Sequence, residues 1–251
     1  MQRYFVQPDQ MTDETVTISG EDIKHISKVM RMGTGDQVIC SDNHGRVARC
    51  TITEITDTSV QLVISEWISS KTELPISVTI AQGLPKHDKL EMIVQKGTEL
   101  GANQFIPFQA SRSIVKWDSK KSKKKTERLQ KIIKEAAEQS HRNRMPECSE
   151  PVSFNKLISL SESFTIKIVA YEEQAKLNET SRLAKLFSNA DIENDDIIVV
   201  IGPEGGLTKD EVQRLQDAGF VVCGFGPRIL RTETASLYVL SAVSYQLELL
   251  R

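Results

Sequence analysis

A glycine-rich segment that follows an apolar run is the part of the sequence best suited to binding a small ligand. Residues 197–201 are all β-branched, and residues 202–206 read Gly-Pro-Glu-Gly-Gly. Glycines remove side chains where a strand meets the next helix, so a ligand can approach bare backbone N–H and C=O groups. Thr208 and Glu211 have the spacing of a capping box, which predicts a helix from there to Gly219. A plain tight turn is the alternative interpretation of the glycine pair.

The sequence lacks two common phosphate-binding loops. A P-loop requires G-x-x-x-x-G-K-[ST], and no segment supplies it. The dinucleotide pattern G-x-G-x-x-G is also absent, although Gly33-Thr34-Gly35 and Gly224-Phe225-Gly226 give short fragments of it. The segment 202–206 is therefore expected to bind a ligand of another class.

A second candidate segment carries charge. Arg228 and Arg231 lie in a loop after a predicted strand, and guanidinium groups in such a loop can stabilise a developing anion. The residues whose side-chain oxygens could cap the following helix are Thr232, Glu233 and Thr234. Pairing of the arginines with Glu204 or Glu233 is an alternative that the sequence leaves open.

Local charge, rather than net charge, indicates a polyanionic partner. The whole chain has a net charge of -2, but residues 112–144 contain twelve Lys and Arg against four acidic residues. This stretch carries +8 and the remainder carries -10. Such a concentration of positive charge attracts the phosphate backbone of a nucleic acid. A lysine run on a solvated helix end is the alternative.

The elements that must position these segments follow from hydrophobic periodicity. After about residue 75, strands alternate with helices, which is typical of a parallel sheet covered by helices. Strands are predicted at 77–84, 104–108, 166–172, 197–202 and 221–226, and helices at 88–100, 120–142 and 208–219. The apolar stripe of the helix 120–142 consists of Leu129, Ile132, Ile133, Ala136 and Ala137. The C-terminal helix is apolar nearly all round, so we expect it in the core or in a subunit interface.

Residues 1 to about 70 predict a separate β domain. Short strands are expected at 16–18, 37–40, 46–55 and 60–67, with one short helix at 21–32 between them. A compact β-barrel is the natural arrangement of such strands. Small polar residues and a proline at 69–75 indicate a linker, so the expected domains are 1–70 and 75–251.

Composition restricts the class of protein. Hydrophobic residues make up 39% and charged residues 26%, as in an ordinary globular protein. No signal sequence and no apolar run of about 18 residues is present, so we expect a cytoplasmic protein without a membrane segment. Four cysteines and four histidines are widely scattered, which argues against a metal site or a disulfide framework.

Four ordered motifs together resemble the RsmE family of 16S ribosomal RNA uridine N3-methyltransferases. They lie at residues 82–101 (QGLPKHDKLEMIVQKGTELG), 135–142 (EAAEQSHR), 201–206 (IGPEGG) and 226–235 (GPRILRTETA). The opening RYFV and the segment 25–32 (HISKVMRM) look like the N-terminal domain of that family, so the resemblance covers essentially the whole chain.

The resemblance implies an α/β fold of the SPOUT type. A PUA-like β-barrel domain would precede a methyltransferase domain whose C-terminal part is threaded into a trefoil knot. General connection rules would not suggest this arrangement, because true knots are rare. The resemblance also implies that S-adenosylmethionine is the cofactor and that two chains pair as a homodimer to complete each site.

Three groups of site residues are expected. The cofactor loops implied by the resemblance contain Tyr171, Glu172, Ile201, Gly202, Pro203, Glu204, Gly205, Gly206, Phe225, Gly226, Ile229, Leu230, Thr232, Thr234 and Ala235. The catalytic candidates are Arg231, Arg228 and Glu233. The basic residues expected to face RNA are Arg3, Lys24, Lys28, Arg31, Arg112, Lys116, Lys121, Lys123, Lys124, Lys125, Arg142 and Arg144.

Methylation at uridine N3 requires the loss of the N3 proton. Arginine cannot accept it, because the guanidinium group does not deprotonate in proteins. Arg231 or Arg228 is therefore expected to stabilise negative charge on the uracil oxygens. Glu233 is the candidate to accept the proton or to orient the base, with helix capping as its alternative role.

Two other functions stay open at this point. One is a non-catalytic RNA-binding assembly factor, against which the intact segments 202–206 and 226–235 argue. The other is a SPOUT methyltransferase that acts on transfer RNA or on another ribosomal position, which only the family resemblance disfavours. The expected partner is 16S ribosomal RNA within the small ribosomal subunit, and no metal is expected.

Overall fold

The computed structural model describes residues 1–172 and 182–250, and the chain divides into two compact units. Unit 1 contains residues 1–73 and 134–145, and unit 2 contains residues 74–133 and 146–251. The long helix α3 (Ser119–Gln139) begins in unit 2, and its last turn and a half belongs to unit 1. Each unit has a hydrophobic core of its own.

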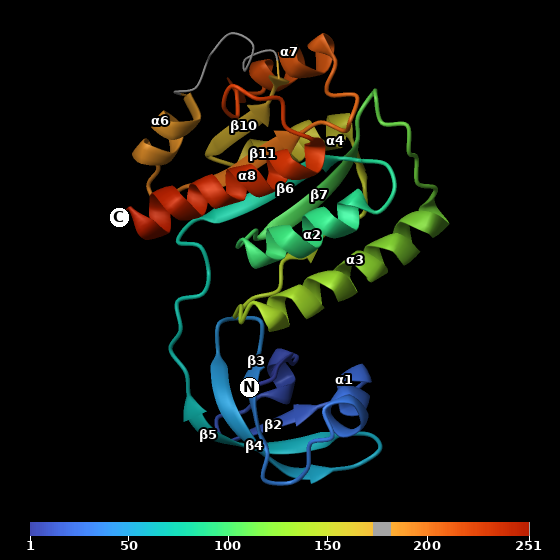
Figure 1. Cartoon of the computed structure of the whole chain (residues 1–251), viewed down its shortest axis with the longest axis vertical. Coiled ribbons are helices and arrows are strands. Elements are labelled where there is room, and N and C mark those ends of the chain that lie inside the picture. The colour runs from blue at the N-terminus through green and yellow to red at the C-terminus, as the bar shows by residue number, and fades with distance from the viewer. Residues whose placement is uncertain (173–181, 251) are drawn as a thin grey trace. The chain divides into compact units, whose positions relative to one another are not determined.

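Unit 1 is built on a curled, half-barrel sheet of five strands (Figure 1). The order of the strands is β1 (Arg3–Phe5), β3 (Gln37–Ser41), β4 (Val47–Ile55), β5 (Val60–Trp67) and β2 (Thr15–Ile18). Two register shifts interrupt the β4–β5 pair, and irregularities of this kind bend a sheet. The four predicted strands are present. Sequence reasoning did not identify β1, because three residues are too few to show an alternating pattern.

The predicted helix of unit 1 is shorter than expected and changes type along its length. It consists of α1 (Glu21–Lys24) followed by a π-helical turn, His25–Val29. Arg31 then adopts a left-handed backbone conformation with φ of 54°, which a helix cannot continue through. Lys24, Lys28 and Arg31 are all exposed on this segment.

Two residues that were predicted to contact RNA, Arg3 and Arg142, belong to a buried polar cluster in unit 1. The Arg142 Nε atom lies 3.1 Å from a Glu73 carboxylate oxygen, and Arg3 Nη1 donates to the Arg142 carbonyl at 3.0 Å and to Asn143 Oδ1 at 2.9 Å. Arg3 is 5% exposed and Arg142 is 3% exposed. Burial lowers the pKa of Arg3, although the Glu73 carboxylate opposes this effect. Because both guanidinium groups are buried and engaged, we remove them from the surface expected to face RNA.

Unit 2 contains a parallel sheet that includes the five predicted strands (Figure 1) and two short strands, at 147–148 and 152–153, that were not predicted. The strand order is β12 (Val221–Cys223), β10 (Ile166–Ala170), β11 (Asp196–Ile201), β6 (Ser77–Gly83), β7 (Gln104–Gln109) and β8 (Glu147–Cys148), and β9 (Val152–Ser153) also pairs with β7. All of these pairs are parallel.

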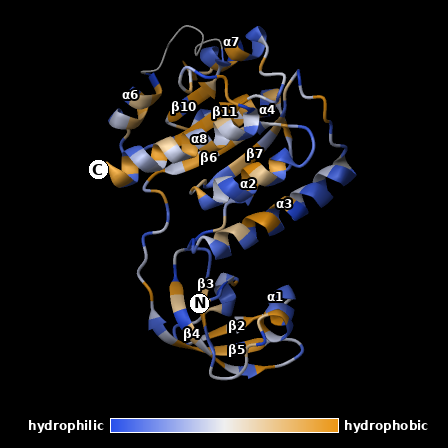
Figure 2. Cartoon of the chain, viewed as in Figure 1, coloured by the Kyte–Doolittle hydropathy of each residue, from blue (hydrophilic) through white to orange (hydrophobic). Residues whose placement is uncertain are grey.

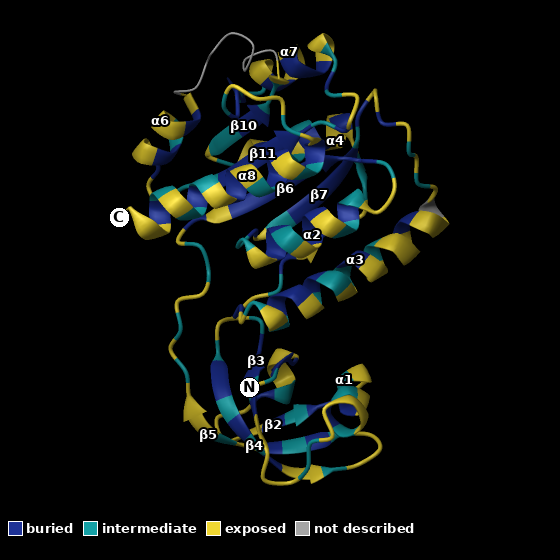
Figure 3. Cartoon of the chain, viewed as in Figure 1, coloured by how far each residue is buried: buried dark blue, intermediate teal, exposed yellow. Residues whose placement is uncertain are grey.

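Helices cover both faces of this sheet. One face packs against α2 (Lys89–Glu99), α3, α6 (Arg182–Asn189) and α8 (Thr232–Ser244), and the other against α4 (Phe154–Leu160) and α7 (Lys209–Asp217). Along β11, Ile197, Val199 and Ile201 belong to the first core, whereas Ile198 and Val200 belong to the second. Burial on both sides explains why β11 is apolar at every position from Ile197 to Ile201, and Figures 2 and 3 show this strand as hydrophobic and buried.

The helix α3 is amphipathic as predicted. Leu129, Ile133, Ala136 and Ala137 are buried, and Ile132 is partly buried. Its lysines near the N-terminal end are exposed to solvent. The helix ends three residues earlier than expected, where His141 adopts a left-handed conformation with φ of 60°.

The C-terminal helix α8, with its π-helical continuation Tyr245–Leu249, has one core face and one exposed apolar face. Val239, Leu240 and Val243 are fully buried within the chain itself. Tyr238 is 40% exposed and Tyr245 is 58% exposed. Neither this helix nor any other in the described ranges 1–172 and 182–250 is long and apolar enough to cross a membrane.

Candidate active site

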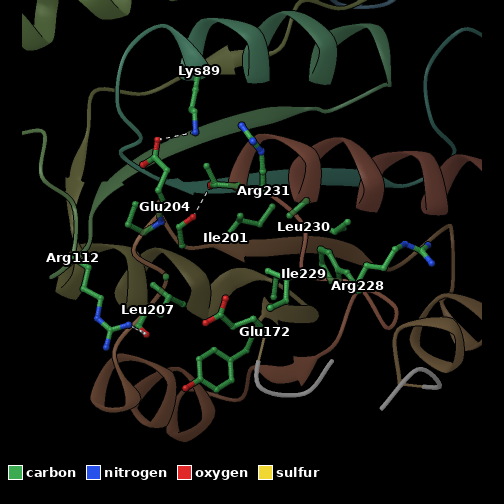
Figure 4. A pocket seen from close by; sticks show the side chains of 18 of the residues that line it. Lys89, Arg112, Glu172, Ile201, Glu204, Leu207, Arg228, Ile229, Leu230 and Arg231 are labelled. Carbon is green, nitrogen blue, oxygen red and sulfur yellow. Dashed lines mark hydrogen bonds and ion pairs between the residues drawn. The ribbon is translucent and has the colours of Figure 1, made fainter. Parts of the chain in front are cut away.

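A pocket of about 500 Å³ lies at the carboxyl edge of the sheet in unit 2 (Figure 4). Small-molecule sites in proteins have volumes of roughly 300–1,000 Å³. The pocket is formed by the loops that follow β10, β11 and β12. Parallel strands end at the same edge of a sheet, so three segments that are far apart in sequence meet there.

Most residues predicted to form the site line this pocket. They are Tyr171, Glu172, Ile201, Gly202, Pro203, Glu204, Gly206, Phe225, Arg228, Ile229, Leu230, Arg231, Thr232 and Ala235. The predicted residues that do not line it are Gly205, Gly226, Glu233 and Thr234. Sequence reasoning did not assign Lys89 to the site, and it placed Arg112 on the RNA surface, but both side chains contribute to the pocket wall.

The capping box after β11 holds the glycine segment in place. The Thr208 hydroxyl accepts from the Glu211 N–H at 3.1 Å, and the Glu211 carboxylate accepts from the Thr208 N–H at 2.8 Å. Glu211 also accepts from the Ser111 N–H at 2.8 Å. Burial acts to raise the pKa of Glu211, but these hydrogen bonds outweigh burial and lower it. The predicted start of the helix after Thr208 is confirmed. The Glu211 carboxylate also links this helix start to the loop at Ser111.

The glycines of the loop serve close backbone contacts. A Cβ atom on Gly202 would lie 3.0 Å from backbone atoms of Gly206 and Leu207, so a side chain there would force the loop backbone to shift. A Cβ atom on Gly205 would lie 3.1 Å from Arg112 Cβ. Arg112 Nη1 in turn donates to the Gly205 carbonyl at 2.9 Å. Gly205 therefore makes room for Arg112 rather than for a ligand, and Arg112 supports the loop.

A buried polar network that the sequence did not predict joins two of the pocket loops. Gln82 Nε2, at the end of β6, donates to Thr232 Oγ1 at 2.8 Å, and the Thr232 hydroxyl donates to the Gly202 carbonyl at 2.6 Å. Ser236 Oγ donates to Gln82 Oε1 at 2.8 Å. Gln82 and Ser236 are fully buried. A glutamine within the apolar strand 77–84 was the only available signal of this network.

The same network corrects the predicted cap of α8. Thr232 was expected to offer its oxygen to the helix, but its hydroxyl is committed to Gly202 and Gln82. The residue at the N-cap position is Arg231, and it makes no side-chain capping hydrogen bond. The helix α8 therefore begins at the pocket wall without a side-chain cap.

The two carboxylates beside the pocket bind a lysine rather than the arginines. Lys89 Nζ lies 3.0 Å from Glu204 and 3.2 Å from Glu233, as Figure 4 shows for Glu204. Burial acts to raise the pKa of Glu204, but its hydrogen bonds, including the one from Lys89, lower it. Bonding to Glu204 raises the pKa of Lys89, against a smaller effect of burial. The alternative in which the arginines pair with Glu204 or Glu233 is therefore wrong.

Arg228 and Arg231 are exposed at the pocket, and neither side chain forms a hydrogen bond or ion pair with any residue in 1–172 or 182–250. Their guanidinium groups are thus free to bind an anion. Glu233, in contrast, has its carboxylate engaged by Lys89 and does not line the pocket. We therefore no longer assign Glu233 the role of proton acceptor.

Comparisons with known proteins indicate the class of protein to which this fold and pocket belong. Residues 72–244 match a family model described as an RNA methyltransferase domain, and residues 18–65 match one described as an RNA methyltransferase PUA domain. The chain is 52% identical to the ribosomal RNA small subunit methyltransferase E of Bacillus subtilis (strain 168), over 100% of this chain and 99% of that one.

Solved structures agree with this class. A crystal structure of a ribosomal RNA small subunit methyltransferase E from Neisseria gonorrhoeae bound to S-adenosyl methionine has a TM-score of 0.84 at 26% identity, over 97% of each chain. A crystal structure of a hypothetical protein has a TM-score of 0.92 at 49% identity, over 100% of each chain. The fold and the pocket thus define an RNA methyltransferase with a PUA domain. Within this class, the chain belongs to the ribosomal RNA small subunit methyltransferase E family.

Replacing Glu211 by glutamine tests the carboxylate that ties the glycine loop. Since Glu211 is 2% exposed and accepts several hydrogen bonds, Glu211→Gln should lower the free energy of unfolding at pH 7 by about 1–3 kcal/mol. The folded-state pKa is depressed, so the contribution is present above the unfolded value of about 4.3 and is lost as the pH falls through the folded value.

Urea unfolding at a series of pH values measures this effect. The difference between wild type and Glu211→Gln should be constant above about pH 5 and shrink below about pH 4. Glu162→Gln, at an exposed carboxylate, is the matched control and should change little. A difference that grows as the pH falls would contradict the assigned role of Glu211.

Proposed function

We propose that this protein transfers a methyl group from S-adenosylmethionine to N3 of a uridine in 16S ribosomal RNA of the small subunit, in the cytoplasm. The observation that carries the proposal is the composition of one pocket. It joins a loop of closely packed glycines with two unpaired arginines, Arg228 and Arg231. Family membership and the S-adenosyl methionine bound to the Neisseria relative support the cofactor.

The chemistry of the pocket suits S-adenosylmethionine. Ile201, Leu230 and Phe225 provide apolar surface for an aromatic base, and the Glu172 carboxylate on the wall provides a negative charge for a cation. Bare backbone at Gly202 and the uncapped start of α8 provide polar groups for hydroxyl and carboxylate groups. When bound, the cofactor supplies an electrophilic methyl group on a sulfonium centre.

The residues of the chain position the base and stabilise its charge. Uracil becomes negative as N3 loses its proton, and this charge spreads over the two carbonyl oxygens beside N3. Arg231 and Arg228 remain protonated and have no carboxylate partner within the described residues, so they are suited to stabilise that charge. Preorganised donors of this kind act without the reorganisation that water would require.

Each unit carries exposed basic residues that we propose bind RNA. On unit 1 they are Lys24, Lys28, Arg31 and Arg144, and on unit 2 Lys116, Lys121, Lys123, Lys124 and Lys125. Within this set, Lys121 pairs with Asp118 at 3.3 Å and Lys125 Nζ lies 4.8 Å from the centre of the Trp117 ring. Lys123 and Lys124 have no partner in the described part of the chain, which makes them the best placed to bind phosphate.

We further propose that two chains pair through the exposed apolar face of the C-terminal helices. Tyr245 and Leu249 are 58% and 71% exposed and follow one another by one helical turn. Exposed apolar residues grouped in this way are typical of interfaces. The domain boundaries at 1–70 and 75–251 stay predictions from the composition of residues 69–75, and the trefoil knot stays a prediction from the family resemblance.

The central experiment combines an activity assay with one variant. The protein is incubated with labelled S-adenosylmethionine and small ribosomal subunits or free 16S RNA, and nucleoside mass spectrometry should detect 3-methyluridine. Arg231→Ala should lose about 2–4 kcal/mol of transition-state stabilisation and keep most of its cofactor affinity in calorimetry. Methylation of another base would refute the proposed function. A parallel loss of cofactor binding would instead make Arg231 a binding or structural residue.

Removing two lysines tests the RNA surface. Lys123→Ala combined with Lys124→Ala should weaken RNA binding and reduce the slope of log affinity against log salt by about 1 for each phosphate that is no longer bound. Cofactor affinity should not change. Lys156→Ala combined with Lys185→Ala removes the same charge from exposed positions elsewhere on unit 2 and should leave the slope unaltered. Equal slopes for wild type and the first variant would show that Lys123 and Lys124 are exposed to solvent but do not bind RNA phosphates.

A charge on the exposed helix face tests the dimer. Tyr245→Glu should yield folded monomers, because a carboxylate placed in an apolar interface is costly to desolvate. Val239 is unsuitable, since it is buried in the core of the chain, and Tyr238 stacks on Phe225 of the pocket at 5.9 Å. Met92→Glu, at another exposed apolar position of unit 2, is the control. Light scattering that finds a monomeric, active wild type at micromolar concentration would refute the proposed dimer.

A further inference from the structure

One side chain, Lys89, connects three elements around the pocket. It extends from the first turn of α2 and binds Glu204 of the loop after β11 (Figure 4). It also binds Glu233 of the first turn of α8. Its side chain is 27% exposed, against 29% for Glu204 and 13% for Glu233. Glu204 also accepts from the Lys86 N–H at 3.1 Å, so its carboxylate has two donors on the α2 side.

The stability of the fold does not explain this arrangement. Lys89 and Glu204 are 27% and 29% exposed, and an ion pair that water still reaches contributes roughly 0–1 kcal/mol, because water screens the charges. Two carboxylates held near each other also repel unless a cation lies between them. We therefore infer the effect of Lys89 from the partners that Glu204 and Glu233 would bind in its absence.

Two unpaired guanidinium groups lie within the same pocket. Lys89, Glu204, Arg228 and Arg231 all line it, and Arg231 precedes Glu233 by only two residues. A carboxylate released from Lys89 would lie at a pocket whose wall carries two arginines without a carboxylate partner among the described residues. Bidentate pairing of arginine with carboxylate is strong, so an arginine bound in this way would be lost to an anionic substrate.

We propose that Lys89 is a positioning residue: it holds Glu204 and Glu233 so that neither pairs with Arg231 or Arg228, which stay available to RNA. This inference rests on the proposed function, because it assumes that the arginines meet the RNA substrate. Lys89 also offsets one of the two negative charges that would otherwise repel phosphate at the pocket. Its ammonium group acts on the carboxylates and makes no contact with RNA.

Four variants separate this role from the alternatives. Lys89→Met removes the cation, Lys89→Arg retains it, and Lys89→Met with Glu233→Gln removes the cation together with one of the carboxylates. Lys96→Met is the matched control, because Lys96 is also on α2 and also pairs with a carboxylate, Glu99, at 2.8 Å, but does not line the pocket. Binding to transcribed 16S RNA is measured by filter retention, cofactor affinity by calorimetry, and the melting temperature as a test of folding.

The expected result is specific to RNA. Lys89→Met should weaken RNA binding by about tenfold with cofactor affinity and melting temperature close to wild type, as for a charge that sets electrostatic complementarity. Lys89→Arg and Lys96→Met should bind RNA like the wild type. The double variant should regain part of the missing RNA affinity, because one of the two carboxylates that compete for the arginines is gone.

Three results would overturn the inference. Full RNA affinity in Lys89→Met would show that the carboxylates do not compete for the arginines. No recovery in the double variant would show that the Glu233 carboxylate does not compete for the arginines. A parallel loss of cofactor and RNA binding would assign Lys89 a structural role in the loop after β11. Each result is distinct from failure of the proposed function, in which wild-type protein forms no 3-methyluridine.

Discussion

Strands β10, β11 and β12 run parallel in a sheet that is buried on both faces, and the site depends on this constraint. Each strand is locked in register by its neighbours and by side chains that alternate between two cores. Their carboxyl ends therefore meet at one edge, where three loops converge on a single pocket. A shift of one residue in β11 would exchange its two sets of core side chains and move the glycine segment out of position.

Hydrogen bonds and charged side chains stabilise the loops at this edge. Gln82, Thr232 and Ser236 form a buried network in which each hydroxyl and the amide find partners. Arg112 donates a hydrogen bond to the glycine segment, and Glu211, which follows that segment, accepts one from Ser111. Because the backbone is fixed in this way before any ligand arrives, little conformational entropy is lost when one binds.

Charge is distributed unequally around the pocket. The acidic side chains Glu204 and Glu233 are paired with Lys89, whereas Arg228 and Arg231 have no partner in the described residues. An anion that enters the pocket thus meets cations that need not first break an ion pair. The basic residues of α3 and of the helix in unit 1 are also exposed, so the attraction of a polyanion extends beyond the pocket.

The sequence by itself determined the features that depend on near neighbours along the chain. The capping box of Thr208 and Glu211, the stripe from Leu129 to Ala137 and the parallel-sheet strands follow from spacing and periodicity, and each is present. The motifs at 201–206 and 226–235 also indicated the family and the loops of the site.

Only the tertiary structure decided which polar groups pair. Gln82 and Thr232 are 150 residues apart, and Arg3 and Asn143 are 140 residues apart. Lys89 was not singled out at all, and the two carboxylates it binds had been considered as partners of the arginines. Composition and periodicity carry no information on such pairs, because a charged side chain is attracted by any opposite charge. The packing of α2 and α8 on one face of the sheet selects the partner that lies within reach.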